Sequence, residues 1–376
     1  MTVVVDHRIA GAVHTAEKVL SMRAGTAVTL AEPEDLGGSG RTHVVRVRVA
    51  QNPLSMDRSL VIKALPDDEP MDAFNRELVS YKYATALPSD SRPGPQLVAY
   101  DSDERTIVLS DLGHGRAMAD LLHSPEQTDI DRAISAWGQA LGRMHAATVG
   151  GEHDFAALLR WSNGGRAVDG LWEQAKSAAE VADTVLTDQF GLPPVPGVLE
   201  VLDEGCSLFV EGDHRAFSPS DVGPENIMIN DSGVQFLDYE WGGFRDATLD
   251  IAYAVVTFGP HLASQWADRT PALETAMVDA WRSEVQAIWP SLGHDRELRR
   301  KVFAARAMWV WLSTVWMLPV DVNRDEQQHG LALFASDPHV IVQRWRDLSR
   351  AAQGLHDGWA AYAAEVADAL DASWLS

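Results

Sequence analysis

Three polar residues near the middle of the chain have the types and the spacing that metal-dependent phosphoryl transfer requires. They are Asp221, Asn226 and Asp238. Transferring a γ-phosphoryl group takes an acidic side chain that accepts the proton of the acceptor hydroxyl, together with oxygen ligands that hold magnesium against a triphosphate. Two carboxylates and an amide supply that set, so the pattern predicts a kinase.

The local sequence around these residues predicts a β-hairpin. Residues 227–229 and 234–237 are two short apolar runs, and the polar cluster 230–233 between them favours a turn. A tight hairpin would bring the three polar groups, two at its entrance and one at its exit, to one end. Asp and Asn also favour turns by bonding their own backbone, and for any one of these residues alone that explanation is preferred. The three together favour catalysis.

Upstream residues could complete such a site. The glycine-rich segment 36–42 lies between two predicted strands, where missing Cβ atoms would let backbone N–H groups approach phosphate oxygens. Lys63 ends the apolar run 60–62, an unusual place for a charge unless it is paired, and Glu77 on the following predicted helix is the candidate partner. Taken alone, the glycine-rich segment is better explained as an ordinary hairpin, and Lys63 and Glu77 are equally well explained as a pair of solvated charges.

The first third of the chain is predicted to be mainly β-strand, with one helix at about residues 72–86. The β-rich runs are 26–30, 43–49, 59–63 and 106–109. Within the second run, valines alternate with Arg46 and Arg48, which indicates a sheet with one solvent-exposed face.

After Gly113 the pattern becomes helical. Further helices are predicted around the stripe from Ile134 to Met144 and at 171–186, 272–288, 298–318, 340–355 and 359–370, with a loop at 190–197. The change in pattern predicts two domains, a nucleotide-binding lobe over residues 1–112 and a catalytic and substrate-binding lobe over residues 113–376.

Together these segments resemble the protein-kinase-like fold, and in particular the aminoglycoside phosphotransferase and choline kinase-like family of small-molecule kinases. The segments similar to the family's motifs are the phosphate loop at 36–42, the lysine strand at 61–63, the partner helix at 76–77, the interlobe segment at 108–113, the helix end at 140–145 and the tail at 244–252. The resemblance covers roughly residues 25–254. It implies an α+β bilobal fold, with an N-terminal antiparallel β-sheet lobe that has one main helix and a larger, mainly α-helical C-terminal lobe.

The resemblance also implies roles for individual residues. Asp221 corresponds to the catalytic base, and Asn226 and Asp238 correspond to the magnesium ligands. The implied nucleotide-binding residues are Gly37, Gly38, Ser39, Lys63, Glu77, Ser110 and Leu112. Asp250 corresponds to a structural residue that braces the catalytic loop, and Glu240 to an acid near substrate or metal.

One departure from the family pattern concerns the catalytic loop. The family's loop usually has the sequence His-Gly-Asp, whereas this chain has Pro219-Ser220-Asp221. The histidine braces the aspartate through packing and hydrogen bonds, and proline can supply only packing. Ser218 and Ser220 are the candidates for replacing the lost hydrogen bond.

The bulk composition excludes some functions. The formal net charge of −23 makes nucleic acid or an anionic membrane surface unlikely as a partner. The single cysteine, Cys206, excludes an intramolecular disulfide and fits a reducing cytoplasm. The N-terminal residues do not have the pattern of a secretory signal, and the most apolar segment, 307–318, is too short to span a bilayer. We therefore expect a cytoplasmic protein without a membrane partner.

The leading hypothesis is a kinase that uses ATP or GTP with Mg2+ to phosphorylate a hydroxyl of a polar small molecule. Two alternatives stay open: a catalytically weak nucleotide-binding module of the same fold, and a nucleotidyl transferase. The sequence allows aminoglycosides, other hydroxylated antibiotics, amino sugars and choline-like alcohols as acceptors, and its acidity mildly favours a cation. Asp321, Asp325 and Glu326 are candidates for contacting an amine. Both a monomer and a homodimer are compatible with the sequence.

Overall fold

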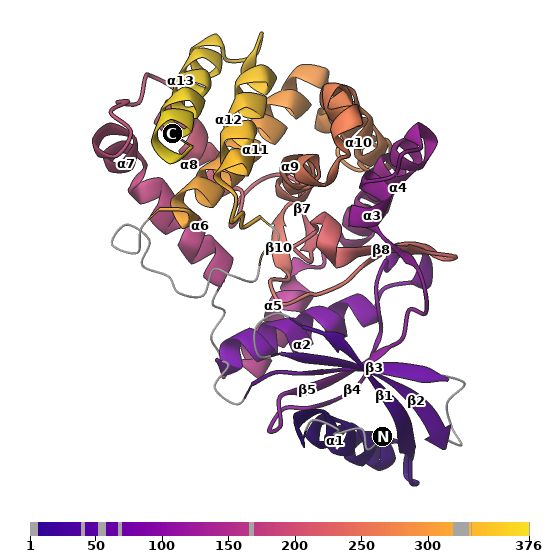
Figure 1. Ribbon diagram of the computed structural model, residues 1–376. Helices are drawn as coiled ribbons and strands as arrows, with labels where there is room; N and C mark the ends of the chain where they lie inside the picture. The colour runs from indigo at the N-terminus through magenta and orange to yellow at the C-terminus, as the bar shows by residue number, and fades with distance from the viewer. Residues whose placement is uncertain are drawn as a thin grey trace.

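The protein folds into two lobes. The structure is a computed structural model that describes residues 7–38, 42–51, 58–66, 70–164, 169–318, 331 and 333–375. A twisted antiparallel sheet with two helices forms the N-terminal lobe, and a larger assembly of helices follows it (Figure 1). The predicted α+β class with two lobes is confirmed, whereas the division of the chain between residues 112 and 113 stays a prediction.

The sheet of the N-terminal lobe has the strand order β1-β2-β3-β5-β4. Its strands are β1 (Thr29–Gly37), β2 (His43–Gln51), β3 (Ser59–Ala64), β4 (Leu97–Asp101) and β5 (Thr106–Ser110). Lys63 lies on the central strand β3, opposite Val44 of β2 and Ile107 of β5. The predicted strand at 26–30 begins three residues later, and β4 was not predicted.

Helix α1 (His7–Ala24) covers the outer face of this sheet (Figure 1). Its buried residues Ala12, Ala16 and Leu20 form a small core with sheet residues such as Val45 and Val47. The sequence did not predict this helix. Its buried stripe is mostly alanine, which has too little hydrophobic contrast to mark a helical period.

The polar residues of β2 lie on the opposite face of the sheet. The Nε of Arg46 donates to Asp111 at 3.0 Å, and Arg48 forms an exposed ion pair with Glu32 at 2.8 Å. The alternation predicted for this strand is therefore present, but its polar face turns toward the helical lobe. Helix α2 (Met71–Thr85) lies between the sheet and that lobe (Figure 1).

The helical lobe also contains two small sheets. Its helices are α3 (Met118–Leu122), α4 (Gln127–Thr148), α5 (Glu152–Ser162), α6 (Gly170–Glu180), α7 (Ala182–Asp188), α8 (Val198–Ser207), α9 (Thr248–Thr257), α10 (Thr270–Val285), α11 (Asp295–Trp316), α12 (Pro338–Ala352) and α13 (Asp357–Trp374). The strands are β6 (Arg116–Ala117), β7 (Arg215–Ser218), β8 (Ile227–Asn230), β9 (Gly233–Phe236) and β10 (Gly243–Asp246). Short 3-10 turns of this lobe are η2 (Pro224–Asn226), η3 (Gly259–His261), η4 (Ser264–Arg269) and η5 (Pro290–Gly293), and η1 (Ser89–Ser91) lies between α2 and β4 of the N-terminal lobe.

Most predicted helices are found within a few residues of their expected bounds. One prediction was wrong, because residues 171–186 form two helices that break at Val181 rather than one. Periodicity alone cannot detect such a break, since the apolar period continues on both sides of it. Helices α5 and α8 were not predicted.

One large core joins the helices of the C-terminal lobe to α2 and to the inner face of the sheet. Trp137, Trp281, Trp309 and Trp311 are among its largest fully buried side chains. The tryptophans of α11 therefore have a structural role in this core. No helix in the described part of the chain is both long and apolar enough to cross a bilayer.

Candidate active site

The predicted hairpin consists of β8 and β9, and it gathers the three polar residues at one end. Asp221 lies in the loop after β7, Asn226 ends η2, and Asp238 follows β9. Ile227 pairs with Phe236, and the backbone N–H of Leu237 donates to the carbonyl of Asn226 at 2.7 Å. This bond closes the hairpin where the chain enters and leaves it. Asp238 has a positive φ of 54°, a conformation that is uncommon outside glycine and is found more often at functional sites.

The ammonium group of Lys63 joins three distant segments of the chain. Its Nζ lies 2.7 Å from Glu77 Oε1 on α2 and 2.8 Å from Asp238 Oδ1. Lys63 and Glu77 are both buried. The structure thus brings Lys63 to the partner expected from the sequence, and it adds a direct contact with Asp238.

The carboxylates around Lys63 determine its charge. Burial by itself lowers the pKa of Lys63, but Asp238 and Glu77 hold that pKa well above its usual range. The lysine therefore stays an ammonium at every physiological pH. A buried cation with a fixed position can attract a phosphate oxygen far more strongly than a solvated one.

Asp221 is buried and has a tyrosine as a hydrogen-bond donor. The hydroxyl of Tyr253 on α9 donates to Asp221 Oδ1 at 2.6 Å, and it accepts from the backbone N–H of Leu333 at 2.9 Å. Burial, and then the charge of Asp221, raise the pKa of Tyr253 well above its usual range. Tyr253 therefore remains protonated and fixes the orientation of the carboxylate.

Ser218, one of the two serines expected to replace the histidine's hydrogen bond, links Asp250 to the loop that precedes Asp221. Ser218 Oγ donates to Asp250 Oδ1 at 2.5 Å and accepts from the backbone N–H of Ser220 at 2.8 Å. His145 lies 3.0 Å from the other carboxylate oxygen of Asp250. Asp250 thus supports the loop that contains Asp221 through Ser218, and Pro219 is not needed as a donor.

Ser220 occupies the position at which the family pattern has glycine, and it has a φ of 72°. A non-glycine residue in this left-handed region costs on the order of 1 kcal/mol. The hydrogen bond to Ser218 and a further bond from Arg245 to Ser220 Oγ hold the residue in place.

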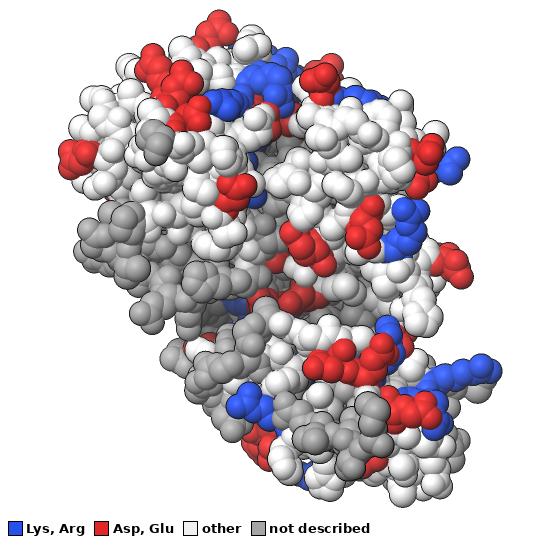
Figure 2. Space-filling view, viewed as in Figure 1, with Lys and Arg blue, Asp and Glu red and all other residues white. Residues whose placement is uncertain are grey.

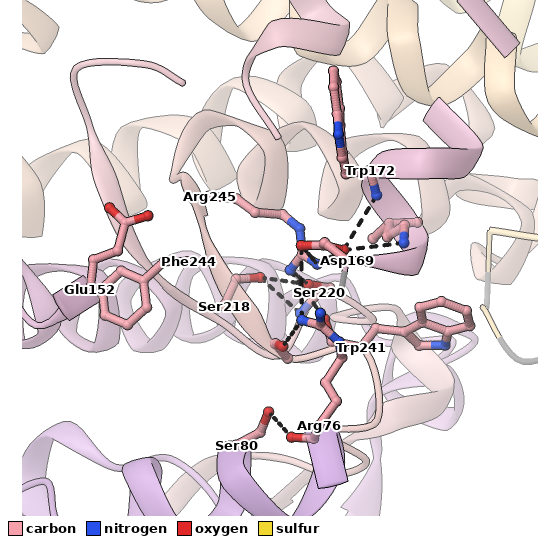
Figure 3. A network of polar contacts seen from close by, with 12 residues as sticks. Arg76, Ser80, Glu152, Asp169, Trp172, Ser218, Ser220, Trp241, Phe244 and Arg245 are labelled. Atoms are coloured by element: carbon pink, nitrogen blue, oxygen red, sulfur yellow. Dashed lines mark hydrogen bonds and ion pairs between the residues drawn. The ribbon is translucent and has the colours of Figure 1, made fainter. Parts of the chain in front are cut away.

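Arg245 on β10 connects the catalytic loop to the helices around it (Figure 3). Its Nη2 lies 2.9 Å from both carboxylate oxygens of Asp169, and its Nη1 donates to the carbonyl of Trp241 at 3.1 Å. Asp169 also caps α6, because its Oδ1 accepts from the backbone N–H groups of Leu171 and Trp172 at 3.1 and 3.3 Å.

The same aspartate faces a second guanidinium from the N-terminal lobe. Arg76, which precedes Glu77 on α2, lies 3.9 Å from Asp169 and donates to the carbonyl of Gly242 at 3.1 Å. Burial by itself raises the pKa of Asp169, but Arg245 and Arg76 hold that pKa below its usual value. We call Arg76, Asp169 and Arg245 the interlobe triad, because it links α2 to the loop that contains Asp221.

The predicted phosphate loop is described only in part. Gly37 ends β1 with a φ of 89°, and Gly38 has a φ of 152°. A Cβ added at Gly38 would lie 2.1 Å from the carbonyl oxygen of Thr42, so only glycine fits there. Ser39 lies outside the described residues, as do Asp321, Asp325 and Glu326.

Ser110 and Leu112, two of the residues predicted to bind the nucleotide, lie at the end of strand β5 and just after it. Ser110 ends β5 and exchanges hydrogen bonds with Gln96, while the carbonyl of Leu112 accepts from the side chain of Asn230 at 2.9 Å. Between them, Asp111 binds Arg46 of β2. Both predicted residues therefore lie on the chain that leaves the sheet toward the helical lobe, and their contact with a base stays a prediction.

Asn226 and Asp238 offer oxygen atoms that suit a hard divalent cation. The side-chain N–H of Asn226 donates to the carbonyl of Asp221 at 3.4 Å, which leaves its Oδ1 as the atom for a ligand. Burial, and then the charge of Asp238, raise the pKa of the nearby Glu240 to about 8. Within the described residues no group of three or more His, Cys, Asp or Glu side chains could hold a metal by itself. The donor set therefore fits a cation that shares its coordination with phosphate oxygens and water.

Several residues of the site were not found from the sequence. Tyr253 follows Asp250 by three residues on the same helix, a spacing that places both on one face, and this could have suggested it. Arg245 and Asp169 have no such local signal, since they are 76 residues apart.

The fold is similar to those of known small-molecule kinases. A choline/ethanolamine kinase family protein from Mesorhizobium loti aligns with a TM-score of 0.51 and 15% sequence identity, over 90% of this chain and 93% of that chain. An ethanolamine kinase from Plasmodium vivax aligns with a TM-score of 0.49 and 12% identity, over 88% of this chain and 84% of that one. No family model and no curated protein sequence matches the chain. At 15% identity the similarity to the Mesorhizobium loti protein concerns the fold, and it confirms the predicted protein-kinase-like architecture.

Proposed function

We propose that the protein transfers the γ-phosphoryl group of ATP or GTP to a hydroxyl group of a polar small molecule. The observation that carries this proposal is the position of Lys63, whose ammonium lies within hydrogen-bonding distance of both Glu77 and Asp238. A structural ion pair would need one carboxylate. The second carboxylate, partly exposed and at the exit of the hairpin, is explained by a site that binds a metal-bound triphosphate.

The residues of the site would divide the work as follows. Asp221 accepts the proton of the acceptor hydroxyl, while Tyr253 keeps its carboxylate in a fixed orientation. Lys63 holds the phosphate oxygens, and Glu77 keeps Lys63 in place when Asp238 turns to other ligands. Asn226 and Asp238 would hold Mg2+, which neutralises the charge of the triphosphate when it is bound. Most of the rate would come from positioning and from preorganised charge.

The acceptor belongs to a broad class of hydroxylated molecules. The similarity in fold to a choline/ethanolamine kinase family protein puts choline and ethanolamine on an acceptor panel. The net charge of −23 favours cationic acceptors, so aminoglycoside-like antibiotics and amino sugars belong on it too.

The test is an acceptor screen with the full chain, Mg2+ and either ATP or GTP, in which release of the nucleoside diphosphate is measured. Asp221→Asn should lower kcat by ~10² to 10⁴ with the acceptor that is found. Asp231→Asn in the exposed hairpin turn is the matched control and should leave kcat unchanged. Equal rates for the wild type and Asp221→Asn would refute the role of the base.

Two other results would point to the alternatives. Magnesium-dependent nucleotide binding without turnover on the whole panel would favour a nucleotide-binding module. A product whose mass has increased by a nucleotide instead of a phosphate would favour nucleotidyl transfer.

A further inference from the structure

A cavity lies in the helical lobe, among α9, η3, α10, α11 and α12. Its volume is about 660 Å3, which is large enough for a small molecule. Its charged lining residues are Asp268, Arg306, Arg344, Arg346, Asp347 and Arg350, and Arg346 pairs with Asp371 at 2.8 Å. Figure 2 shows basic side chains beside a hollow between α12 and α10, although the chain as a whole is strongly acidic.

Arg306 and Arg350 also have carboxylate partners. Arg306 binds both carboxylate oxygens of Glu274 at 3.1 and 2.8 Å. Arg350 lies 3.3 Å from the same Glu274 and 2.7 Å from Asp347. Their charges are compensated within the protein, so neither calls for a ligand.

Arg344 differs from the other arginines of the cavity in its lack of a carboxylate partner among the described residues. Its exposed fraction is only 5%, and in the described part of the chain no carboxylate lies within ion-pair distance of it. Nη1 donates to the carbonyl of Leu333 at 2.7 Å, while the buried Nε has no hydrogen-bond partner. The charge of Glu225 also acts on Arg344, but its carboxylate pairs instead with His261 at 2.9 Å.

Such an arrangement is costly without a ligand. A buried guanidinium that lacks a counter-charge loses hydration that one carbonyl cannot replace. Burial lowers the pKa of Arg344 to about 10, so the group still has its charge at neutral pH. An anion in the adjoining cavity would supply both the missing charge and an acceptor for Nε.

We propose that this cavity binds a small molecule with a phosphate or carboxylate group, and that Arg344 is its main anion-binding residue. Nothing in this inference rests on the proposed kinase activity. The phosphate or carboxylate group belongs either to the acceptor of the proposed kinase reaction or to a separate ligand. The chemistry that Arg344 recognises is the same in both cases.

The position of Arg344 connects such a ligand to the catalytic loop. Arg344 binds the carbonyl of Leu333, the N–H of Leu333 donates to Tyr253, and Tyr253 donates to Asp221. Three consecutive hydrogen bonds therefore lead from the anion site to the proposed base. A ligand that moved Arg344 would act on the residue that orients Asp221.

The direct test is binding of inorganic phosphate to the full chain by isothermal titration calorimetry, at constant ionic strength in chloride. A saturating non-hydrolysable ATP analogue with Mg2+ keeps the nucleotide site filled. The wild type should bind phosphate saturably, and Arg344→Gln should weaken binding by roughly 10-fold or more. Arg296→Gln, an exposed arginine on α11, is the charge-matched control and should bind as the wild type does.

A second variant covers the case in which Arg344→Gln does not fold. Val340 lines the cavity in the first turn of α12, where a carboxylate suits the helix. Val340→Glu would place a fixed counter-charge in the cavity and should abolish phosphate binding. The proposal is overturned if the wild type shows no saturable binding of phosphate. It is also overturned if a folded Arg344→Gln variant binds phosphate with unchanged affinity. If Arg344→Gln does not fold, unchanged phosphate affinity in Val340→Glu overturns it instead.

A kinetic arm separates the two sources once an acceptor is known. Phosphate that raises KM for the acceptor without changing kcat indicates that the anionic group is part of the acceptor. Phosphate that changes kcat indicates a separate ligand. The binding arm needs no turnover, so its failure and failure of the proposed kinase activity are distinguishable.

Discussion

Replacing Asp169 by asparagine should destabilise the protein through loss of charge alone. Asparagine keeps the shape of the side chain and an oxygen that can cap α6, and both residues are good caps. What disappears is the negative charge between Arg245 and Arg76. The interlobe triad would then consist of two buried guanidinium groups without a common counter-charge.

The expected magnitude follows from the geometry. Removing one partner of a buried ion pair costs ~3–5 kcal/mol. The side chain of Asp169 is 23% exposed, and its contact with Arg76 is long at 3.9 Å, so we place the loss below that range, at about 2–3 kcal/mol. Asp169→Ala should lose a further ~1 kcal/mol because it also removes the cap.

The assay is urea unfolding followed by tryptophan fluorescence, with the free energy of unfolding taken from the midpoint and slope. Asp337 is the matched control, because it also caps a helix, α12, but is exposed and has no arginine partner among the described residues. Asp337→Asn should change the free energy of unfolding by less than ~0.5 kcal/mol.

The pH dependence provides an independent check. The pKa of Asp169 is lower in the folded protein than in the unfolded chain, so the folded state loses its advantage when Asp169 is protonated. Its contribution is present above the unfolded pKa of ~3.9 and is lost as the pH falls through the folded pKa. The gap between wild type and Asp169→Asn should therefore narrow below about pH 4. A gap near neutral pH no larger than that of Asp337→Asn would refute the reasoning.

Three further predictions concern single side chains. Tyr253→Phe should lower the free energy of unfolding by ~1–3 kcal/mol in urea titrations, because the buried N–H of Leu333 loses its acceptor. The same variant should also lower kcat. An unchanged free energy of unfolding would contradict the hydrogen bond between Tyr253 and Leu333. Burial raises the pKa of Cys206 to about 11, so at pH 8 iodoacetamide should alkylate the native protein at least ~100-fold more slowly than the urea-unfolded chain, and similar rates would show an accessible thiol. Asp238→Ala should reduce magnesium-dependent nucleotide affinity by ~10-fold or more in equilibrium binding, whereas Asp231→Asn should not, and equal affinities would exclude the metal role.

Local sequence patterns were enough to predict the hairpin and the pair formed by Lys63 and Glu77. The turn residues of the hairpin lie directly between its two strands, and Glu77 lies on the first helix after the strand of Lys63. Both features therefore involve residues that are close in sequence, where turn residues and hydrophobic periodicity are informative. Helix α1 was not predicted, because its buried alanines give only a weak apolar stripe.

The supports of the catalytic loop could not be predicted in this way. Asp169 meets Arg245 across 76 residues, and Tyr253 meets Leu333 across 80. An arginine or a tyrosine in isolation gives no indication of which distant partner it will have. Those contacts depend on how the helices pack, which the spacing of charges along the chain does not determine.

Strand β5 belongs to both hydrophobic cores of the protein. Val108 packs with α1 in the small outer core, whereas its neighbours Ile107 and Leu109 pack with α2 in the large one. Because unfolding of β5 would disrupt both cores, we expect the sheet and the core beneath α2 to unfold together instead of as separate lobes. An isolated N-terminal fragment would have a bare apolar surface along α2 and β5, and we would expect it to aggregate.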